Sequence, residues 1–193
     1  VSKYLPEFSD MQVCIGEENG KMKTEAASSP ITIQQLASHT SGLSYSFVPG
    51  PVGAMYIAEE MERGLGNVPS AGGEFFTEGT KPPFGNLREW TKALAELPLV
   101  AQPGTVWNYS VGMDVLGALI EEVSGMTFGE FLEERIFSPL GMEDTGFIVP
   151  EEKLNRFAAN YSPTPDNMML MDDPEKSGYR TPPQLESGGG GLV

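Results

Sequence analysis

Residues 107–120 read WNYSVGMDVLGALI, and this stretch joins a loop to a strongly apolar helix. The loop is turned by Pro103-Gly104 just before it. After the loop, apolar side chains recur at the three- and four-residue spacing of an α-helix. They are Leu116, Leu119, Ile120 and Val123, with Val115 beside them. We therefore expect a helix that is buried along one face.

Three residues mark the ends of this predicted helix. Ser110 is a favoured N-cap residue, Asp114 adds negative charge to the first turn, and Gly125 closes the far end. Tyr109 then lies at the positive end of the helix, where free N–H groups stabilise an anionic or partly anionic phenol. The alternative is that Tyr109 is an ordinary amphipathic residue at the rim of the core.

Composition excludes several kinds of function. Twelve basic and 27 acidic residues leave a formal net charge of −15, which argues against nucleic acid or an anionic membrane as a partner. The single Cys14 excludes a disulfide framework and a cysteine-based metal site, and the single His39 excludes a histidine-rich one. No apolar run approaches the roughly 18 residues that span a bilayer. We expect a soluble protein, cytoplasmic or periplasmic, with no metal and no cofactor.

The first part of the chain contains a hairpin signal. Met11–Ile15 and Lys21–Glu25 are short extended candidates, and the Asn19-Gly20 pair between them is typical of a tight turn. Before them, Val1–Phe8 reads as a turn or helix end, with Pro6 blocking its continuation. We therefore predict a small peripheral hairpin.

Capping motifs predict the other helices. Thr32–Gln35 forms a capping box for a helix that runs to near Gly42, and Thr127–Glu130 forms a second one. Asn86 caps a third helix. The second box follows the central helix directly, so the two form a helical hairpin joined by residues 124–126. The apolar faces are Leu87, Trp90, Leu94 and Leu97 after Asn86, and Phe128, Phe131, Leu132 and Ile136 after Thr127.

Residues 39–42, HTSG, place a serine two positions from the only histidine. Residues i and i+2 do not face each other on a helix, so the pair has poor geometry for a nucleophile and its base. We expect His39 to end its helix and to hydrogen-bond nearby backbone. Ser41 is then a C-cap residue.

The remaining segments are less regular. Residues 51–63 predict another helix, and residues 64–85 form a long glycine- and proline-bearing segment typical of a lid or a flexible excursion. Arg156–Tyr161 and Met168–Met171 are short strand candidates. The glycine run at Ser187–Gly191 reads as a flexible linker, because it lacks the lysine and the spacing of a phosphate loop. No internal repeat or domain boundary is visible.

Four segments in order resemble the serine β-lactamase and penicillin-recognising family. They are ITIQQLASHTSGL at 31–43, QPGTVWNYSVGMDVLGALI at 102–120, EFLEERIFSPLGM at 130–142 and GGGGLV at 188–193. The similarity is greatest to the class C and family VIII carboxylesterase branch, and it covers nearly the whole chain.

The resemblance implies a role for Tyr109. Members of the family use a serine in a Ser-x-x-Lys motif, a tyrosine in a Tyr-x-Asn motif and a third motif on a strand. Tyr109 matches the tyrosine, and its implied role is general base toward the serine and then general acid toward the leaving group. Trp107, Ser110 and Val111 are the expected residues of the substrate pocket.

The chain departs from the family pattern at two points. No serine here is followed three positions later by lysine, and Val111 stands where the family has an asparagine. Valine has no amide to offer a substrate, so the resemblance favours an esterase over an efficient β-lactamase. We expect the 193 residues to be one β-lactamase-like domain truncated at both ends, and inactive alone because the serine and the lysine lie outside it.

These observations together give the expected fold and function. The fold is an α/β (α+β) β-lactamase/DD-peptidase-like fold, mostly its helical subdomain with short β hairpins, lacking most of the antiparallel sheet. The function is cleavage of a small-molecule ester, or a related amide, through an acyl-serine intermediate. The alternatives are a β-lactamase or D-Ala-D-Ala peptidase, and a non-catalytic binding protein with the same fold. Apolar surface left open where the sheet belongs predicts self-association.

Overall fold

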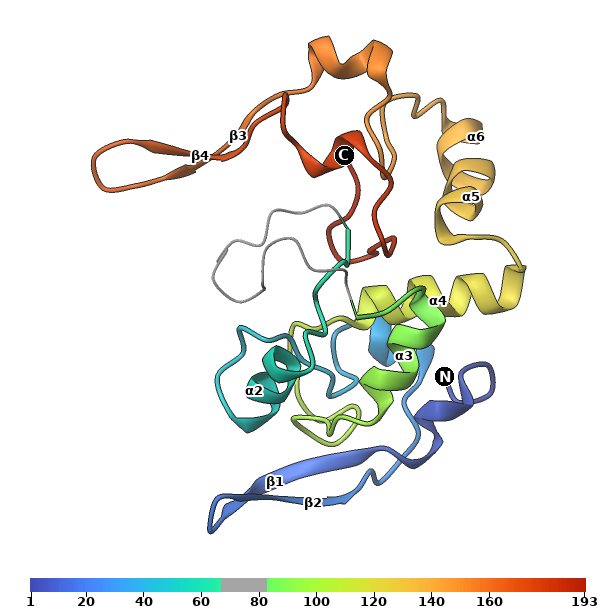
Figure 1. The fold of residues 1–193 in the computed structure, drawn as a ribbon. Coiled ribbons are helices and arrows are strands. Elements are labelled where there is room, and N and C mark those ends of the chain that lie inside the picture. The colour runs from blue at the N-terminus through green and yellow to red at the C-terminus, as the bar shows by residue number, and fades with distance from the viewer. Residues whose placement is uncertain (67–82) are drawn as a thin grey trace.

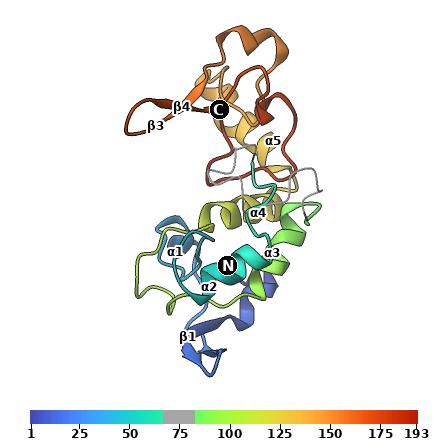
Figure 2. The same ribbon diagram turned by 60° about the vertical axis from the view of Figure 1, so that its left-hand side comes forward.

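The computed structural model describes residues 1–66 and 83–193. The molecule has two parts, and helix α4 (Gly112–Ser124) lies between them in both views (Figures 1 and 2). The first part holds the chain up to α4, and the second holds the chain from α5 onward. The predicted lid or excursion at residues 64–85 lies largely outside the described residues.

The N-terminal hairpin confirms the prediction from Asn19-Gly20. Strand β1 (Gln12–Glu18) pairs antiparallel with β2 (Lys21–Ala26), with an irregularity between Cys14 and Gly16. Asn19 and Gly20 have φ angles of 54° and 71°, as a tight turn of this kind requires. The prediction for Pro6 was wrong. Pro6 begins a 3₁₀ helix, Pro6–Asp10, because a missing N–H costs nothing at the first helical position.

Helices α1 (Ile33–Ala37), α2 (Pro51–Ala58) and α3 (Leu87–Ala95) follow in the first part. The Thr32 capping box and the Asn86 cap are both present, as predicted. The predicted end of α1 was wrong, because the helix stops at Ala37 with Ser38 as its C-cap. His39 instead has a left-handed φ of 54°, so neither His39 nor Ser41 belongs to the helix.

Helix α4 is buried in its first turns and not, as its periodicity predicts, along one face over its whole length. Val115, Ala118 and Leu119 are buried, whereas Val123 is 59% exposed, so its assignment to the core face was wrong. Helix α4 contacts α1, α3 and α5, and its last residues, from Glu122 to Ser124, are exposed. Ser110 is not the N-cap, because the helix begins at Gly112 with Val111 before it. Gly125 ends the helix in the left-handed conformation, as predicted.

The second part begins with the predicted capping box at Thr127 and helix α5 (Phe128–Leu132). A π-helical turn, Glu133–Phe137, follows and leads into α6 (Ser138–Leu140). Phe137 is buried and Ile136 is exposed, so the prediction that Ile136 faces the core was wrong. The wider π turn adds about one residue to the helical repeat. Phe137 therefore takes the core-facing position that was predicted for Ile136.

The rest of the second part is mostly loop. It contains the 3₁₀ helices Glu151–Arg156 and Gly178–Arg180 and a second antiparallel hairpin, β3 (Asn160–Pro163) with β4 (Met168–Asp172). This hairpin projects away from the body of the molecule (Figure 1). It confirms the candidate Met168–Met171 as β4. The bounds of the other candidate, Arg156–Tyr161, were wrong, because Arg156 ends a 3₁₀ helix and β3 begins only at Asn160.

Trp90 is central to the hydrophobic core. Its ring is fully buried, and its indole N–H donates to the carbonyl of Met61 at 2.6 Å. Fully buried residues around it come from most elements of the first part. They include Leu5, Phe8, Leu36, Leu43, Tyr56, Leu94, Leu99 and Val115. A core of this size fixes α1, α3 and α4 relative to one another.

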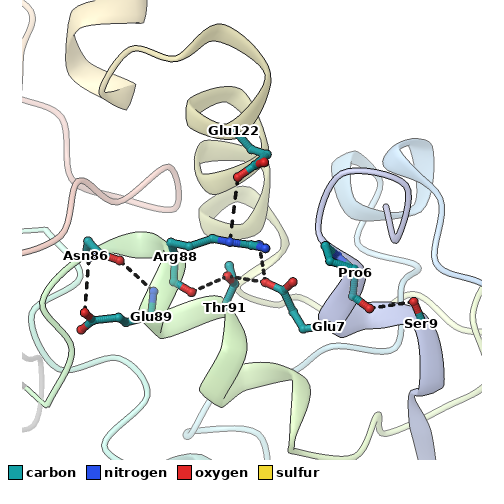
Figure 3. A network of polar contacts seen from close by, with 8 residues as sticks. All are labelled: Pro6, Glu7, Ser9, Asn86, Arg88, Glu89, Thr91 and Glu122. Carbon is teal, nitrogen blue, oxygen red and sulfur yellow. Dashed lines mark hydrogen bonds and ion pairs between the residues drawn. The ribbon is translucent and has the colours of Figure 1, made fainter.

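A polar network ties the N-terminal 3₁₀ helix to α3 and α4 (Figure 3). Glu7 accepts hydrogen bonds from Arg88 at 2.5 Å and from the Thr91 hydroxyl at 2.8 Å. Arg88 also lies 3.9 Å from Glu122 on α4. The guanidinium therefore lies between two carboxylates from different elements.

The architecture is helical and poor in sheet, as the sequence predicts. The described residues hold two small antiparallel sheets of two strands each. Among those residues, no helix is long and apolar enough to cross a bilayer.

Replacing Gly42 by alanine should destabilise the fold. Gly42 has a φ of +87°, and an added Cβ would lie 2.3 Å from the carbonyl oxygen of Ala101. Gly125 is the matched control, because it has a φ of +72° but open space around its Cα. Gly125→Ala should cost about 1–2 kcal/mol from the left-handed backbone alone, and Gly42→Ala about 1–3 kcal/mol more from the clash. Urea unfolding of both variants measures the difference, and equal losses would contradict the close contact.

Candidate functional site

The loop of Tyr109 lies along the turn that follows α1. The N–H of Asn108 donates to the His39 carbonyl at 2.8 Å, and its side-chain amide donates to the Leu43 carbonyl at 2.7 Å. The N–H of Val111 donates to the Ser44 carbonyl at 3.2 Å. Segments about 70 residues apart in the chain are thus paired along residues 39–44 and 108–111. This pairing sets the position of Tyr109 before α4 begins.

The four predicted site residues divide into two pairs. Trp107 and Tyr109 are 65% and 42% exposed, whereas Ser110 and Val111 are buried. The change from exposed to buried comes between Tyr109 and Ser110, just before α4 begins at Gly112. Tyr109 as a base, and Trp107, Ser110 and Val111 as pocket residues, stay predictions. Any substrate contact from Ser110 or Val111 requires access beneath the present surface.

Tyr109 belongs to an aromatic cluster, defined as His39, Tyr45, Phe47, Trp107 and Tyr109. The Tyr109 ring centroid lies 4.8 Å from that of His39 and 5.1 Å from that of Tyr45. Phe47 and Trp107 flank it at 6.5 Å each. Offset and tilted rings at these distances attract one another and restrict rotation of the phenol. The surface formed by Phe47, Trp107 and Tyr109 is apolar and open.

Tyr45 is held in its protonated form. Burial raises its pKa well above the usual range, and the negative charge of Asp114 raises it further. A hydrogen bond with the Tyr109 side chain acts in the same direction. A phenol that keeps its proton is a hydrogen-bond donor, so Tyr45 supplies a donor beside the Tyr109 oxygen.

Asp114 is a buried carboxylate beneath this cluster. Its Oδ1 accepts hydrogen bonds from the Ser187 hydroxyl at 2.5 Å and from the Gly189 N–H at 3.2 Å. Its Oδ2 has no hydrogen-bond partner among the described residues. Burial raises the pKa of Asp114 to about 6, although the two hydrogen bonds lower it in part. The sequence indicated only a helix-dipole role for this residue.

The glycine run at Ser187–Gly191 is not a flexible linker, so that interpretation was wrong. Ser187 is buried, and a Cβ on Gly189 would lie 2.7 Å from the Tyr45 hydroxyl and 3.0 Å from Oδ2 of Asp114. A Cβ on Gly188 would lie 2.5 Å from the Met113 carbonyl. The glycines are present because the backbone approaches α4 and Tyr45 too closely for any side chain.

Glu62 is a second acid that the sequence did not single out. It accepts hydrogen bonds from the N–H of Ser46, at 2.6 Å, and from the Ser46 hydroxyl. Burial raises its pKa, and these two hydrogen bonds lower it in part. Glu62 therefore anchors the segment that carries Tyr45 and Phe47.

His39 makes a different contact from the one predicted. Its Nδ1 accepts from the N–H of Ser110 at 3.3 Å. The partner is a backbone group, as predicted, but it lies 71 residues away in the chain and not nearby. Ser41 is fully buried and its hydroxyl accepts from the N–H of Leu43, so it does not face the aromatic cluster as a nucleophile. No group of three or more His, Cys, Asp or Glu residues able to hold a metal ion occurs within residues 1–66 and 83–193.

A cavity of about 660 Å³ lies elsewhere, in the second part of the molecule. Its wall includes Phe137, Phe147, Val149 and Phe157, with Lys153 at the rim. No residue of the aromatic cluster lines it. The cavity and the Tyr109 region are therefore separate features.

Comparisons with known proteins agree with one another. The sequence model of the Beta-lactamase family matches residues 1–193. Esterase EstB of Burkholderia gladioli is 33% identical over 162 residues, covering 83% of this chain and 34% of the esterase. An uncharacterised protein of Mycobacterium tuberculosis is 31% identical over 194 residues, covering 100% of this chain and 42% of its own length.

The similarity extends to solved structures. Unliganded simvastatin synthase (LovD) from Aspergillus terreus matches with a TM-score of 0.65 and 26% identity, covering 100% of this chain and 41% of the synthase. The chain thus spans less than half the length of the relatives it matches. Esterases and acyltransferases both occur among the curated relatives.

Replacing Asp114 by asparagine should change how stability depends on pH. The pKa of Asp114 is raised on folding to about 6. Its protonated form therefore stabilises the folded state below about pH 4, and this stabilisation is lost as the pH rises through about 6. The amide keeps an oxygen for Ser187 and Gly189 but carries no charge. The difference in free energy of unfolding between Asp114→Asn and the native chain should therefore shift by up to about 3 kcal/mol in favour of the variant from pH 4 to pH 8.

Urea unfolding at the two pH values measures this effect. The exposed Asp10→Asn is the control for loss of one negative charge. Parallel pH profiles for the native chain and Asp114→Asn would show that the buried carboxyl does not titrate as described.

Proposed function

The chain belongs to the Beta-lactamase family, and from this premise we propose that it is part of a serine hydrolase that cleaves carboxylic esters through an acyl-serine intermediate. The observation that carries the proposal is the placement of Tyr109. Its phenol is exposed at the start of α4, while the residues on either side of it are fixed by hydrogen bonds to the turn at 39–44. The similarity to an esterase supports the choice of ester as substrate.

Tyr109 is the proposed proton carrier of the reaction. In the first half, the Tyr109 oxygen takes the proton of the serine hydroxyl as the serine oxygen bonds to the ester carbonyl carbon. Tyr109 then gives that proton to the departing alkoxide as the carbon–oxygen bond of the ester breaks. In the second half, water attacks the acyl-serine, gives its proton to Tyr109, and the proton returns to the serine.

The surroundings of Tyr109 suit this role. The N-terminus of α4 presents the positive end of a 13-residue helix, and Tyr45 offers a protonated phenol beside the Tyr109 oxygen. The serine and its lysine are proposed to lie outside these 193 residues, since no Ser-x-x-Lys motif occurs in them.

Acyl transfer to an alcohol is the second candidate. It shares the acyl-serine intermediate and differs only in that an alcohol replaces water in the second half. The acyltransferases among the relatives favour it, and so does the apolar surface of Phe47 and Trp107, which can hold an organic acceptor next to Tyr109. Product analysis with and without an added alcohol distinguishes the two.

Tyr109→Phe should lower the esterase rate of the whole protein by about 10²–10⁴-fold, because phenylalanine cannot carry the proton. Tyr161→Phe is the control, since Tyr161 is exposed on the projecting hairpin. Hydrolysis of p-nitrophenyl butyrate, together with the midpoint of thermal unfolding, gives rate and folding separately. A Tyr109→Phe variant with the native rate would remove Tyr109 from the mechanism.

The 193-residue chain itself should not react with a fluorophosphonate probe. Ser41 and Ser110 are both buried, and neither has a lysine three residues later. Intact mass after incubation tests this. A stoichiometric adduct would mean that one of these serines is the nucleophile and that the proposed location of the serine is wrong.

A further inference from the structure

His39 is bonded to the residues on both sides of Tyr109. Its carbonyl oxygen accepts from the N–H of Asn108 at 2.8 Å, and its Nδ1 accepts from the N–H of Ser110 at 3.3 Å. The two contacts hold the backbone immediately before and after Tyr109. One residue, 70 positions away in the chain, thus fixes the backbone that carries the phenol.

The imidazole also contacts the Tyr109 side chain directly. The ring centroids are 4.8 Å apart with an interplanar angle of 55°, and Trp107 meets the imidazole edge-on at 6.1 Å. Tyr45 lies 5.1 Å from Tyr109. The phenol therefore packs against both His39 and Tyr45, and its rotation is restricted.

The hydrogen bonds define the protonation state of His39. A backbone N–H can only donate, so the Nδ1 that accepts from Ser110 has a free lone pair. In the neutral imidazole the proton is then on Nε2. The Ser110 hydroxyl also lies 3.3 Å from Nδ1, and it accepts from the N–H of Gly112, the first residue of α4. The imidazole is thus connected to the start of the helix.

The backbone of His39 is itself unusual. Its φ of 54° is left-handed, a conformation uncommon for residues with a side chain but better tolerated by Asn, Asp and His. The conformation reverses the chain after α1, where the N–H of Thr40 donates to the Gln35 carbonyl at 2.9 Å. The side chain is thereby directed to the Tyr109 loop.

We propose that His39 is a positioning residue for Tyr109 and that it acts only as the neutral imidazole with its proton on Nε2. This inference rests on the proposed function, since it concerns the base of that reaction. Protonation of Nδ1 removes the lone pair that accepts the hydrogen bond from the Ser110 N–H. Two donors then face each other and repel, so the loop that carries Tyr109 is held less firmly. The site then has a built-in requirement for neutral His39.

The environment of His39 favours the neutral form. Burial lowers the pKa of the imidazole, and burial is the one cause of that shift. The titratable side chain that faces the ring from the 107–111 loop is Tyr109. Because the pKa is lowered on folding, the neutral and positioned state holds above that pKa and is lost as the pH falls through it.

The tautomer can be measured on the chain itself, because it contains a single histidine. Long-range ¹H–¹⁵N correlation of the imidazole at pH 8 should show the proton on Nε2, and a titration should give a pKa below that of free histidine. A dominant Nδ1–H tautomer would overturn the inference, because that form cannot accept from Ser110.

Two substitutions separate the contacts of His39 in the whole protein. His39→Asn keeps an acceptor at the place of Nδ1, tolerates the left-handed backbone and does not titrate. His39→Phe keeps an aromatic ring and removes the acceptor. With p-nitrophenyl butyrate at pH 8, His39→Phe should lower kcat by up to about 10²-fold with little change in KM, and His39→Asn should restore most of it.

The pH profile distinguishes positioning from a purely structural role. In the native enzyme, kcat should fall as the pH drops through the measured pKa of His39, which gives the pH profile an acid limb. His39→Asn should lack this acid limb. A native kcat in His39→Phe, or an unchanged acid limb in His39→Asn, would overturn the inference. Tyr109→Phe serves as the reference: if it keeps the native rate, the proposed function fails, and if it is inactive while His39→Phe is not, only the positioning role fails.

Discussion

The Asp114 carboxylate joins the two parts of the molecule, and the site depends on it. It lies in the first turn of α4 and accepts hydrogen bonds from Ser187 and Gly189, which belong to the end of the chain. Keeping a carboxylate away from water is costly, and here the cost is only partly offset, since one oxygen has no partner among the described residues. These hydrogen bonds hold the glycine run against Tyr45, and Tyr45 in turn packs against Tyr109. The aromatic cluster therefore rests on a polar contact between distant segments.

Local features of the structure could be predicted from the sequence. The Asn19-Gly20 turn, the Thr32 and Thr127 capping boxes and the Gly125 helix end all appear where the residues indicate. Each of them depends on hydrogen bonds or backbone angles within a few neighbouring residues, so the information lies within a short window. The position of Tyr109 just before α4 follows from the same local reasoning.

Features that depend on distant contacts could not be predicted in this way. The periodicity of α4 places Val123 inside, but which turns of a helix are covered is decided by α1, α3 and α5. His39 was predicted to hydrogen-bond backbone near the end of its own helix, whereas its Nδ1 accepts from the N–H of Ser110, 71 residues later. The role of Asp114 and of the glycine run depends on their meeting each other. Neither segment alone contains that information, because each reads as an ordinary pattern of its kind.

Val111 shows how the core constrains the chemistry of the site. The side chain is fully buried and packs within the hydrophobic core, directly after a loop that carries exposed Tyr109. An asparagine at this place would bring an amide with several hydrogen-bonding groups into apolar surroundings, at a cost of about 1–3 kcal/mol for each group left unpaired. The valine is therefore the residue that this packing favours. The resemblance expects an amide at this position to contact the substrate, and a fully buried valine offers neither a donor nor an acceptor for that contact.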